Sequence, residues 1–525
     1  MESKSLGDVE SMLFLMHFIP HPVRVTLLVS LVLGLSGCIE TYKPAKSPRP
    51  RTEQLTVKHR SGGTHYRMLV DDGVWYQLMG TDLLVIDART GRISYRESLA
   101  TAGTSGPAID VVRDGDEMLI VLEESGVVRL TLDDPRRPWL EDTRTSASLG
   151  IRPRGIVVID GSRLVYGDGG VVDFDTGHQL VEVDGVVTSV DESSAGLVYC
   201  LDRRIHMVAD DDFVGSANML VALRDMPVGD ARRHVFVRNE LNGSLVGVLG
   251  DDLRELDTDV WTIPMPGSTR SVRQHADRLV VTSDLGVRIY RMGAEGLALE
   301  EEVDILGAYD AMVLDEDQLV VSGTFGRGTW RLTDGLEAQR RSFSMYHPEP
   351  AGLQRAVSDG RNLLADSDRG MWMYRIGQET SAQVSTDVIE FTDPSREAVM
   401  LDWTFRIVGD GREIEVETPV GVDRLVAPRD GRFHCVVAAD GVIWLGHDRG
   451  IIMVRLPAEG LSLPPEWDTM SPEDRLEAGV GPLDGMTKLS VRLDGPVFFL
   501  EPLLLGGGIA YVSGGGGFGV VSEEF

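Results

Sequence analysis

The sequence contains few cysteines and few positive charges, and both shortages limit what the protein can be. It has 3 cysteines in 525 residues. It has 51 lysine and arginine residues but 82 aspartate and glutamate residues, which gives a formal net charge of -31. A surface this acidic repels phosphate backbones, so the composition argues against nucleic acid as a partner.

The cysteines outside the amino end lie in apolar surroundings. Cys200 and Cys435 stand within the runs Leu-Val-Tyr-Cys-Leu and Phe-His-Cys-Val-Val, and their spacing suggests no metal site. Free cysteine is among the most buried residue types, so we expect two thiols in the core. A disulfide between them is the alternative, because the compartment indicated below is oxidising.

Catalytic sequence motifs are also missing. The chain has no His-Glu-x-x-His, Gly-x-Ser-x-Gly or Ser-x-x-Lys pattern, and no phosphate-binding loop ending in Gly-Lys-Ser or Gly-Lys-Thr. The glycine runs 167–170 and 514–517 are interpreted as turns between strands, because no helix follows them to receive a phosphate. The sequence therefore predicts no catalytic residue, no cofactor and no metal ligand.

Histidines and acidic turns leave a metal site open as the alternative. A ring of repeats can gather scattered histidines in its central channel, but surface or core histidines are the simpler expectation. The acidic turns 210–212, 315–317 and 366–368 lack a calcium-loop pattern and are interpreted as solvated hairpin turns. The histidines from the body of the chain are His65, His178, His206, His234, His275, His347, His434 and His447.

Long apolar runs are confined to the amino end, so no transmembrane helix is expected in the body. Residues 25–37 form an uncharged apolar run that is preceded by Arg24 and is too short to span a bilayer comfortably. It ends in Leu35-Ser36-Gly37-Cys38, which resembles the lipobox of bacterial lipoproteins. The resemblance implies cleavage before Cys38 and acylation of its thiol. An ordinary secretory signal with a chance cysteine is the alternative.

These features divide the chain into three parts. Residues 1–37 are expected to be a lipoprotein signal peptide, and residues 38–65 a disordered tether that holds the body to a membrane through lipid on Cys38. The stretch 41–53 is basic and proline-rich, which favours a semi-extended chain. The residue after Cys38 is Ile39. An aspartate at this position would resemble the inner-membrane retention signal, so its absence favours the outer membrane.

The body, residues 66–525, repeats a hairpin of two short apolar runs around a polar turn. The clearest copies are 362–376 and 442–456, which share Asp-Arg-Gly and an arginine before the last aliphatic residue. Turn residues recur at a period of about 42, the length of one four-stranded propeller blade. The turn markers are Gly126, Gly170, Arg204, Gly243, Gly286, Gly328, Gly370, Gly411 and Gly450.

We therefore predict an all-β fold with few helices: a β-propeller of one ring or of two rings. The period implies more units than the usual four to eight blades, which leaves the number of rings open. A strand near the amino end is expected to complete the last blade, because closure removes sheet edges. Residues 457–486 interrupt the repeat and are expected to be an insertion with a short helix beginning at Ser471.

The chain resembles extracytoplasmic propeller lipoproteins as a class, which includes the propeller subunit of the outer-membrane β-barrel assembly machine. The resemblance rests on the lipobox and the blade pattern, and it transfers no functional residue. It implies a lipid-anchored envelope module that binds or scaffolds a protein or an envelope polymer. The rival hypotheses are an extracytoplasmic lyase or hydrolase with its site in the central channel, and a purely structural envelope component.

Overall fold

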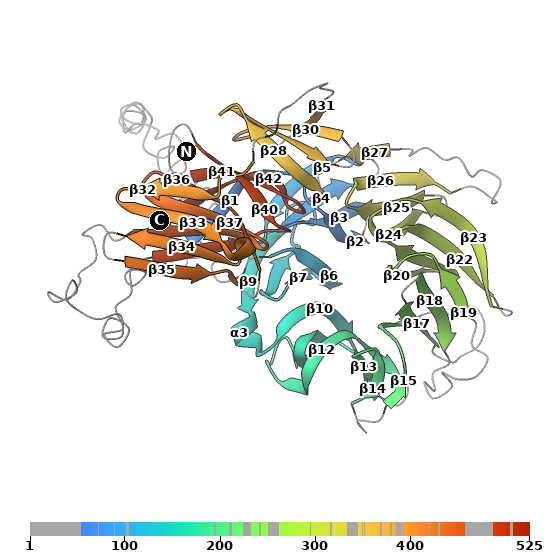
Figure 1. Cartoon of the computed structure of the whole chain (residues 1–525). Helices are drawn as coiled ribbons and strands as arrows, with labels where there is room; N and C mark the ends of the chain where they lie inside the picture. The colour runs from blue at the N-terminus through green and yellow to red at the C-terminus, as the bar shows by residue number, and fades with distance from the viewer. Residues whose placement is uncertain are drawn as a thin grey trace, which may run out of the picture. The chain divides into compact units, whose positions relative to one another are not determined.

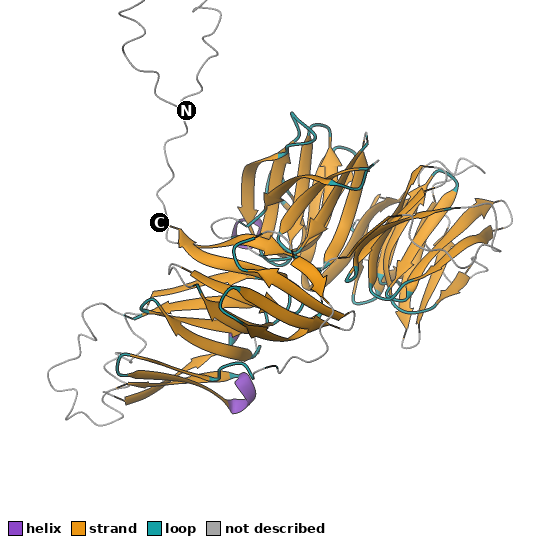
Figure 2. Cartoon of the chain, turned by 90° about the horizontal axis from the view of Figure 1, so that it is seen from above, coloured by secondary structure: helices purple, strands orange, loops and turns teal. Residues whose placement is uncertain are grey.

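The computed structural model describes residues 54–524, except for segments 209–212, 224–232, 250–261, 333–344, 385–390, 457–486 and 504–507 and gaps of at most three residues elsewhere. Strands dominate these residues (Figure 2), which confirms the all-β prediction. The helical pieces described are α3 (Ser146–Leu149) and the 3-10 turn η4 (Gly409–Gly411). No helix in the described ranges is long and apolar enough to cross a membrane.

Several expectations lie outside these ranges. The signal peptide 1–37, the lipidation residue Cys38 and the insertion 457–486 with its helix start at Ser471 all fall on residues that the structure does not describe.

Six of the ten antiparallel sheets form what we call the first group (Figure 1), and one of the six has six strands. Its strands are β2 (His65–Asp71), β3 (Val74–Met79), β4 (Asp82–Asp87), β5 (Ile93–Ser98); β6 (Ala108–Asp114), β7 (Glu117–Leu122), β8 (Gly126–Thr131), β9 (Trp139–Thr145); β10 (Arg152–Ile159), β11 (Ser162–Asp173), β12 (Gln179–Ser193), β13 (Gly196–Leu201), β14 (Arg204–Met207), β15 (Phe213–Gly215); β16 (Met219–Leu223), β17 (Arg233–Glu240), β18 (Gly243–Leu249), β19 (Thr262–Met265); β20 (Thr269–His275), β21 (Arg278–Ser283), β22 (Gly286–Gly293), β23 (Gly296–Asp304); and β24 (Ala308–Asp315), β25 (Gln318–Gly323), β26 (Gly326–Arg331), β27 (Met345–Pro348).

The other four sheets form the second group, which includes the first strand of the chain. Its strands are β28 (Leu353–Ser358), β29 (Asn362–Ser367), β30 (Gly370–Arg375), β31 (Ser381–Val384); β32 (Glu397–Met400), β33 (Trp403–Val408), β34 (Glu413–Thr418), β35 (Gly421–Val426); β36 (Phe433–Ala439), β37 (Val442–His447), β38 (Gly450–Arg455), β39 (Thr487–Arg492); and β40 (Val497–Pro502), β41 (Gly508–Ser513), β42 (Gly517–Glu524) with β1 (Gln54–Ser61).

The glycines of the repeated hairpin have a packing function. Gly286 and Gly450 each begin the third strand of a sheet at a positive φ, +158° and +138°. A Cβ atom there would lie 2.4 Å from the carbonyl oxygen of Val303 or 2.1 Å from that of Val491, both on the fourth strand. A side chain would therefore push the fourth strand away, which explains why the repeat keeps glycine at this place.

Neighbouring sheets of the first group pack face to face through shared apolar clusters, in chain order from β2–β5 to β24–β27. The sheet β24–β27 also contacts the sheet β2–β5. Met68 and Trp75 of the first sheet share a buried cluster with Val320 of β25. Strand β2 thus contacts both β6 and β24.

The second group packs in a different order. The sheet β32–β35 packs on β36–β39, which packs on the sheet of β40–β42, which in turn packs on β28–β31. Strand β1 completes the sheet of β40–β42, because it pairs with β42 from Gln54 opposite Glu524 to Ser61 opposite Phe518. This pairing agrees with the expectation that a strand near the amino end completes the last sheet.

The same strand corrects the expected tether. Residues 54–61 were expected to be disordered, but Leu55 is buried in the core that β36–β39 shares with β40–β42, and Val57 packs against it. Two apolar residues at alternate positions give a strand one buried face, and that pattern outweighs the basic residues around it. The folded part therefore begins near residue 54, not 66.

The chain passes between the two groups twice at one place. Residues 62–64 lead from β1 into β2, and residues 349–352 lead from β27 into β28. The N–H of Gly63 donates to the carbonyl oxygen of Pro350 at 3.0 Å, and the N–H of Thr64 donates to that of Gly515 at 2.8 Å. Gly62 has a φ of +80°, and a Cβ there would lie 2.3 Å from the Pro350 oxygen, so only glycine fits this crossing.

One expected turn is a strand. Residues 167–170 lie inside β11, where the register shifts at 168–170 and 171–172 bend the strand. A Cβ on Gly170 would lie 1.9 Å from the Val181 oxygen, so the missing side chain lets β12 approach β11 closely. The chain does not reverse its direction at this glycine. The reversal comes later, where the N–H and hydroxyl of Thr176 both donate to Asp173 at 2.7 Å. Thr90 and Asp87 make the same turn.

Candidate functional site

A β-bulge recurs on the first strand of most sheets and on β12 of the six-stranded sheet. In β6, Ala108 pairs with Leu122 and Asp110 with Val121, so Ile109 is the extra residue. In β24, Tyr309 is the extra residue between Ala308 and Asp310. A bulge re-aims the side chain at its position. The residues at these bulges are Tyr66 with Arg67, Ile109, Arg154, Thr188, Arg270, Tyr309, Gln354, His434 and Phe498.

The residue after the bulge reaches the first strand of the sheet that packs next. The Asp110 carboxylate accepts from the N–H of Ile156, and the Ser189 hydroxyl accepts from that of Leu220, both at 3.0 Å. Asp310 does the same with Met68, which lies on the first sheet of the group. In the second group the thiol of Cys435 takes this place and donates to the Val497 oxygen at 3.6 Å.

A group of charged side chains converges between β2, β6, β20 and β24. The guanidinium of Arg273 donates to both oxygens of Asp310, at 2.9 and 2.6 Å, and to the Met68 oxygen at 2.7 Å. Arg67 lies between two acids, 3.7 Å from Asp310 and 3.8 Å from Asp110. Opposite charges in equal number make this charge cluster, Arg67, Asp110, Arg273 and Asp310, neutral as a whole.

The two acids of the charge cluster differ in their electrostatics. Burial disfavours ionisation of Asp310, but the charge and hydrogen bonds of Arg273, with smaller effects of Arg67 and the Met68 N–H, outweigh it and hold the pKa of this carboxyl below its usual range. For Asp110 burial wins over Arg67 and the Ile156 N–H, so its pKa is raised. Asp310 is therefore held as an anion, and Asp110 takes up a proton more easily.

Tyr166 lies beside Asp110. Burial, and then the Asp110 charge, raise the pKa of its phenol. Its ring occupies the space over Gly155, where a Cβ atom would lie 2.2 Å from the phenol oxygen. The protonated hydroxyl is a hydrogen-bond donor next to the one acid of the charge cluster whose pKa is raised.

Aromatic and basic bulge residues also meet, and two of them, Tyr66 and Tyr309, directly precede Arg67 and Asp310 of the charge cluster. Tyr66 and Tyr309 pack edge to face with ring centroids 5.1 Å apart, and the guanidinium carbon of Arg270 lies 5.5 Å from the centre of the Tyr309 ring. The Tyr66 hydroxyl donates to Asp494 at 2.8 Å, and burial together with that carboxylate raises the pKa of Tyr66 well above its ordinary value. We call Tyr66, Arg270 and Tyr309 the aromatic–arginine site.

The hairpin turn 123–125 links the two groups beside this site. Glu124 accepts from Arg154 at 3.0 Å and from Arg449 of the second group at 2.9 Å. Arg492, also of the second group, donates to the Glu123 backbone oxygen at 2.7 Å. Glu124 has a φ of +56°, which turns its side chain toward these arginines. The second group is thus held by charge-assisted bonds to the same end of the first group where Tyr66 meets Asp494.

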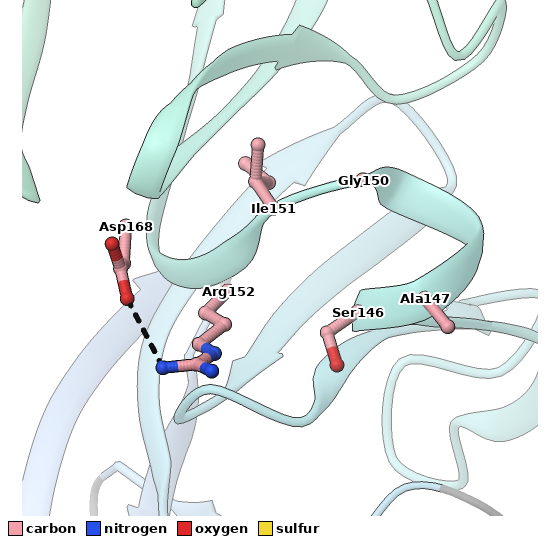
Figure 3. Close-up of a pocket in the computed structure, with 6 residues that line it drawn as sticks. All are labelled: Ser146, Ala147, Gly150, Ile151, Arg152 and Asp168. Carbon is pink, nitrogen blue, oxygen red and sulfur yellow. Dashed lines mark hydrogen bonds and ion pairs between the residues drawn. The ribbon is translucent and has the colours of Figure 1, made fainter. Parts of the chain in front are cut away.

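A surface hollow of about 490 Å³ lies elsewhere, next to α3 (Figure 3). Ser146, Ala147, Gly150 and Ile151 line it, and Arg152 and Asp168 form an ion pair at its edge, 3.3 Å apart. Both charges are exposed and already paired, and α3 has only four residues, so the hollow presents no group that is positioned for chemistry.

The structure separates most of the histidines considered above. His434 and His447 lie on neighbouring strands, and His434 contacts Asp448 with Nε2 2.5 Å from Oδ1. His206 stacks on Tyr199, and His234 contacts the Glu192 backbone oxygen. Within the described ranges no three His, Cys, Asp or Glu residues are grouped to hold a metal ion. Cys200 and Cys435 are buried free thiols, which confirms the expected core cysteines.

Sequence reasoning did not find the charge cluster or the aromatic–arginine site. A signal was present: Ala108-Ile109-Asp110 and Ala308-Tyr309-Asp310 share the pattern Ala-x-Asp at the start of a first strand. Of the acidic turns, Asp366 pairs with Arg355, whereas residues 210–212 lie outside the described residues.

Comparisons with known proteins do not name a family. No protein-family model and no curated protein matches the chain. Among solved structures, the computationally designed Ika8 protein matches with a TM-score of 0.37 and 11% sequence identity, over 62% of this chain and 100% of that chain. A likeness this distant carries neither a fold nor a function across.

Proposed function

We propose that the protein is a lipid-anchored, extracytoplasmic β-propeller that binds a protein or an envelope polymer. In this proposal the first group is a ring of seven blades, in which β12 serves two neighbouring blades. The support is that Asp310 contacts Met68 as Asp110 contacts Ile156 and Ser189 contacts Leu220. A link between the last and the first blade that repeats the links between consecutive blades is what a ring requires.

The observation that supports a binding function is that the backbone bulge is constant while the side chain of the extra residue varies. The backbone device recurs from sheet to sheet, whereas the extra residue changes between arginine, tyrosine, threonine and isoleucine. A constant scaffold with a variable side chain suits recognition better than one fixed reaction. Arginine and tyrosine are also the residues that carry most binding energy in protein interfaces.

The charge cluster supports the same view. Each of its carboxylates accepts a backbone N–H of a neighbouring sheet, and Arg273 is bound to Asp310 and Met68. These groups are occupied in holding sheets together, while Arg270 is exposed on the Tyr309 ring. The aromatic–arginine site is therefore the part of the first group that we assign to a partner.

The anchor belongs to the proposal as well. Acylation of Cys38 would hold the folded body to the outer membrane through the residues that precede β1. Replacing Cys38 with serine tests this: full-length protein should move from the membrane to the soluble fraction and lose incorporation of labelled palmitate. Retention of Cys38→Ser in the membrane with unchanged labelling would contradict the anchor.

Capture from solubilised membranes tests the binding site. The Arg270→Ala/Tyr309→Ala variant should lose partners that the wild-type chain retains. The matched control is Arg291→Ala, an exposed arginine on β22 with a side chain that is 58% accessible. Identical partners for the wild type and the double variant would reject the aromatic–arginine site.

An enzyme remains the second candidate function, on the strength of Asp110. Its raised pKa, with Tyr166 and Arg67 beside it, is the kind of environment in which a carboxyl serves as general acid or base. This candidate is a lyase or hydrolase with its site in the channel of the first group. Asp110→Asn keeps an acceptor for the Ile156 N–H but removes the acid, so any activity found should fall by about 100-fold or more.

A further inference from the structure

One face of the sheet β32–β35 is exposed although it carries apolar residues. Its other face packs on β36–β39 through Phe405, Ile414 and Val416, which are fully buried. On the exposed face Val399, Val422 and Val426 are 59, 60 and 66% accessible, and Leu401 at the strand end is 82% accessible. These four account for most of the strongly exposed large apolar residues among those described.

The exposed face is ordered in rows across the strands. One row reads Val399, Thr404, Glu417 and Val422, and the next reads Glu397, Arg406, Glu415 and Arg424. In the second row Arg406 donates to Glu397 at 2.7 Å and Arg424 lies 3.7 Å from Glu415. A row with valine at both ends beside a row of alternating charge defines which side chains a partner surface has to present.

The sheet β28–β31 precedes β32–β35 in the chain and also has a face that shares no apolar cluster with another described sheet. The sheet β28–β31 packs on β41 and β42 with Leu363, Ala365 and Trp372. Its opposite face has the rows Val357, Leu364, Met373 and Ala382, and Arg355, Asp366, Met371 and Val384. The clusters that bury the described core residues put β28–β31 and β32–β35 in none together.

The two faces are complementary by position on the first two strands of each sheet. On the first strands, Arg355 precedes Val357 by two residues, and Glu397 precedes Val399 by two. On the second strands, Asp366 of β29 stands where β33 has Arg406. Stacking β28 over β32 and β29 over β33 would therefore place arginine over glutamate, aspartate over arginine and valine over valine.

The position of Arg355 indicates the direction of this contact. It is the residue after the bulge of β28, the place that Asp110, Ser189, Asp310 and Cys435 occupy in other sheets. Each of those four contacts the first strand of the sheet that packs next. Arg355 is 65% accessible and pairs with Asp366 in its own sheet, and its guanidinium carbon lies 4.6 Å from the centre of the Phe391 ring in the link to β32.

From this geometry we infer that the exposed face of β32–β35 is an interaction surface whose occupant is the free face of β28–β31 in the same chain. Closure joins Arg355 to Glu397 and completes a ring of four sheets in the second group. The occupant is the chain's own sheet rather than a second copy, because no apolar cluster of the described residues covers either face and a link of only twelve residues, 385–396, joins the two sheets. The inference concerns the second group alone, so it stands or falls separately from the aromatic–arginine site and the anchor.

Cross-linking of the full-length chain tests the closure. The variant Arg355→Cys/Glu397→Cys places two thiols on faces that would stack about 10 Å apart, within reach of a short bismaleimide. The control Arg355→Cys/Arg424→Cys moves the second thiol to β35, three strands further across the sheet and out of reach. Since Arg355 and Glu397 are both accessible, the substitutions are tolerated by the fold.

We expect most of the first variant to form an intramolecular link between the two cysteine peptides, and the control to form none. A cross-linked dimer would overturn the inference in favour of a second copy as occupant. Full labelling of both thiols without any link would overturn it as well.

A second variant guards against an artefact of the thiols. Val399→Asp should lower the melting temperature by about 3 °C or more at every protein concentration if the face is covered. The control Leu299→Asp on β23 changes a residue that is 38% accessible and should have a smaller effect. Equal melting temperatures for Val399→Asp and wild type would contradict the closure, and a loss that grows on dilution would indicate a dimer.

Discussion

The carboxylate of Asp310 accepts the backbone N–H of Met68 at 3.0 Å, across 242 residues of sequence. The same carboxylate binds Arg273, whose guanidinium also reaches the Met68 carbonyl oxygen. One acid thus connects β2, β20 and β24.

Removing this acid should be costly. Asp310→Ala leaves the guanidinium of Arg273 without its main partner in a buried place, which costs about 3–5 kcal/mol of unfolding free energy. The matched control is Asp168→Ala, whose partner Arg152 is 53% accessible and whose loss costs about 0–1 kcal/mol. Urea unfolding followed by tryptophan fluorescence measures both. Equal losses would mean that Asp310 does not join the ends of the first group.

The close approach of the fourth strand to the hairpin glycine is testable at Gly450. Gly450→Ala combines a strained φ with a Cβ 2.1 Å from the Val491 oxygen, so it should cost about 2–4 kcal/mol. Gly196→Ala is the control, because its φ is +117° but nothing lies within 4 Å of the new Cβ. It should cost about 1 kcal/mol, from backbone strain alone. Similar melting temperatures for the two variants would contradict the steric explanation.

The buried side chain of His447 should make the free energy of unfolding depend on pH. Burial lowers its pKa from 6.5 to about 4; the charge of Asp448 opposes this shift, and His434, Arg449 and Arg492 add smaller lowering effects. In this window the unfolded chain binds the proton and the folded chain does not, so stability falls as the pH drops from about 6.5 to 4. The full effect is roughly 3 kcal/mol.

His447→Gln should flatten this part of the stability curve, measured as unfolding free energy between pH 4 and 7. The exposed His178 provides the control, since His178→Gln should leave the slope as in the wild type. A wild-type slope in His447→Gln would show that other groups cause the acid sensitivity.

The link between the groups through Glu124 and Arg449 can be measured with a double-mutant cycle. Their 2.9 Å ion pair has one side chain that is 10% accessible and one that is 40% accessible. We expect Glu124→Gln and Arg449→Ala to show a coupling energy of about 1 kcal/mol, because partly buried pairs are less screened than exposed ones. Strict additivity of the two substitutions would mean that the bond does not contribute to holding the groups together.

The strand hairpins could be predicted because they are local. Runs such as 442–446 and 450–455 carry their own apolar pattern and turn glycine, and β37 and β38 form as that pattern requires. The buried thiols of Cys200 and Cys435 followed from equally local evidence. Residues 54–61 were missed because the alternation of Leu55 and Val57 is short and lies among basic residues.

Which sheets pack on one another could not be predicted from the sequence. Two residues in contact across a sheet boundary can be separated by several other sheets along the chain. Nothing near Asp310 in sequence names Met68, and nothing near Tyr66 names Asp494. The charge cluster and the aromatic–arginine site are made by such distant pairs, so a count of repeats alone does not reveal them. The Ala-x-Asp pattern marks the acids but not their partners.

The pairing of β1 with β42 has a consequence for biosynthesis. Among the described strands, β1 is the first to leave the ribosome or a translocation pore, and it finds its partner only when β42 follows, since Gln54 lies opposite Glu524. Until then the edge of β1 that pairs with β42 has unpaired backbone groups, and the last sheet stays incomplete. A chain that ends before β42 would keep every earlier sheet but would leave β1 without the strand that pairs with it.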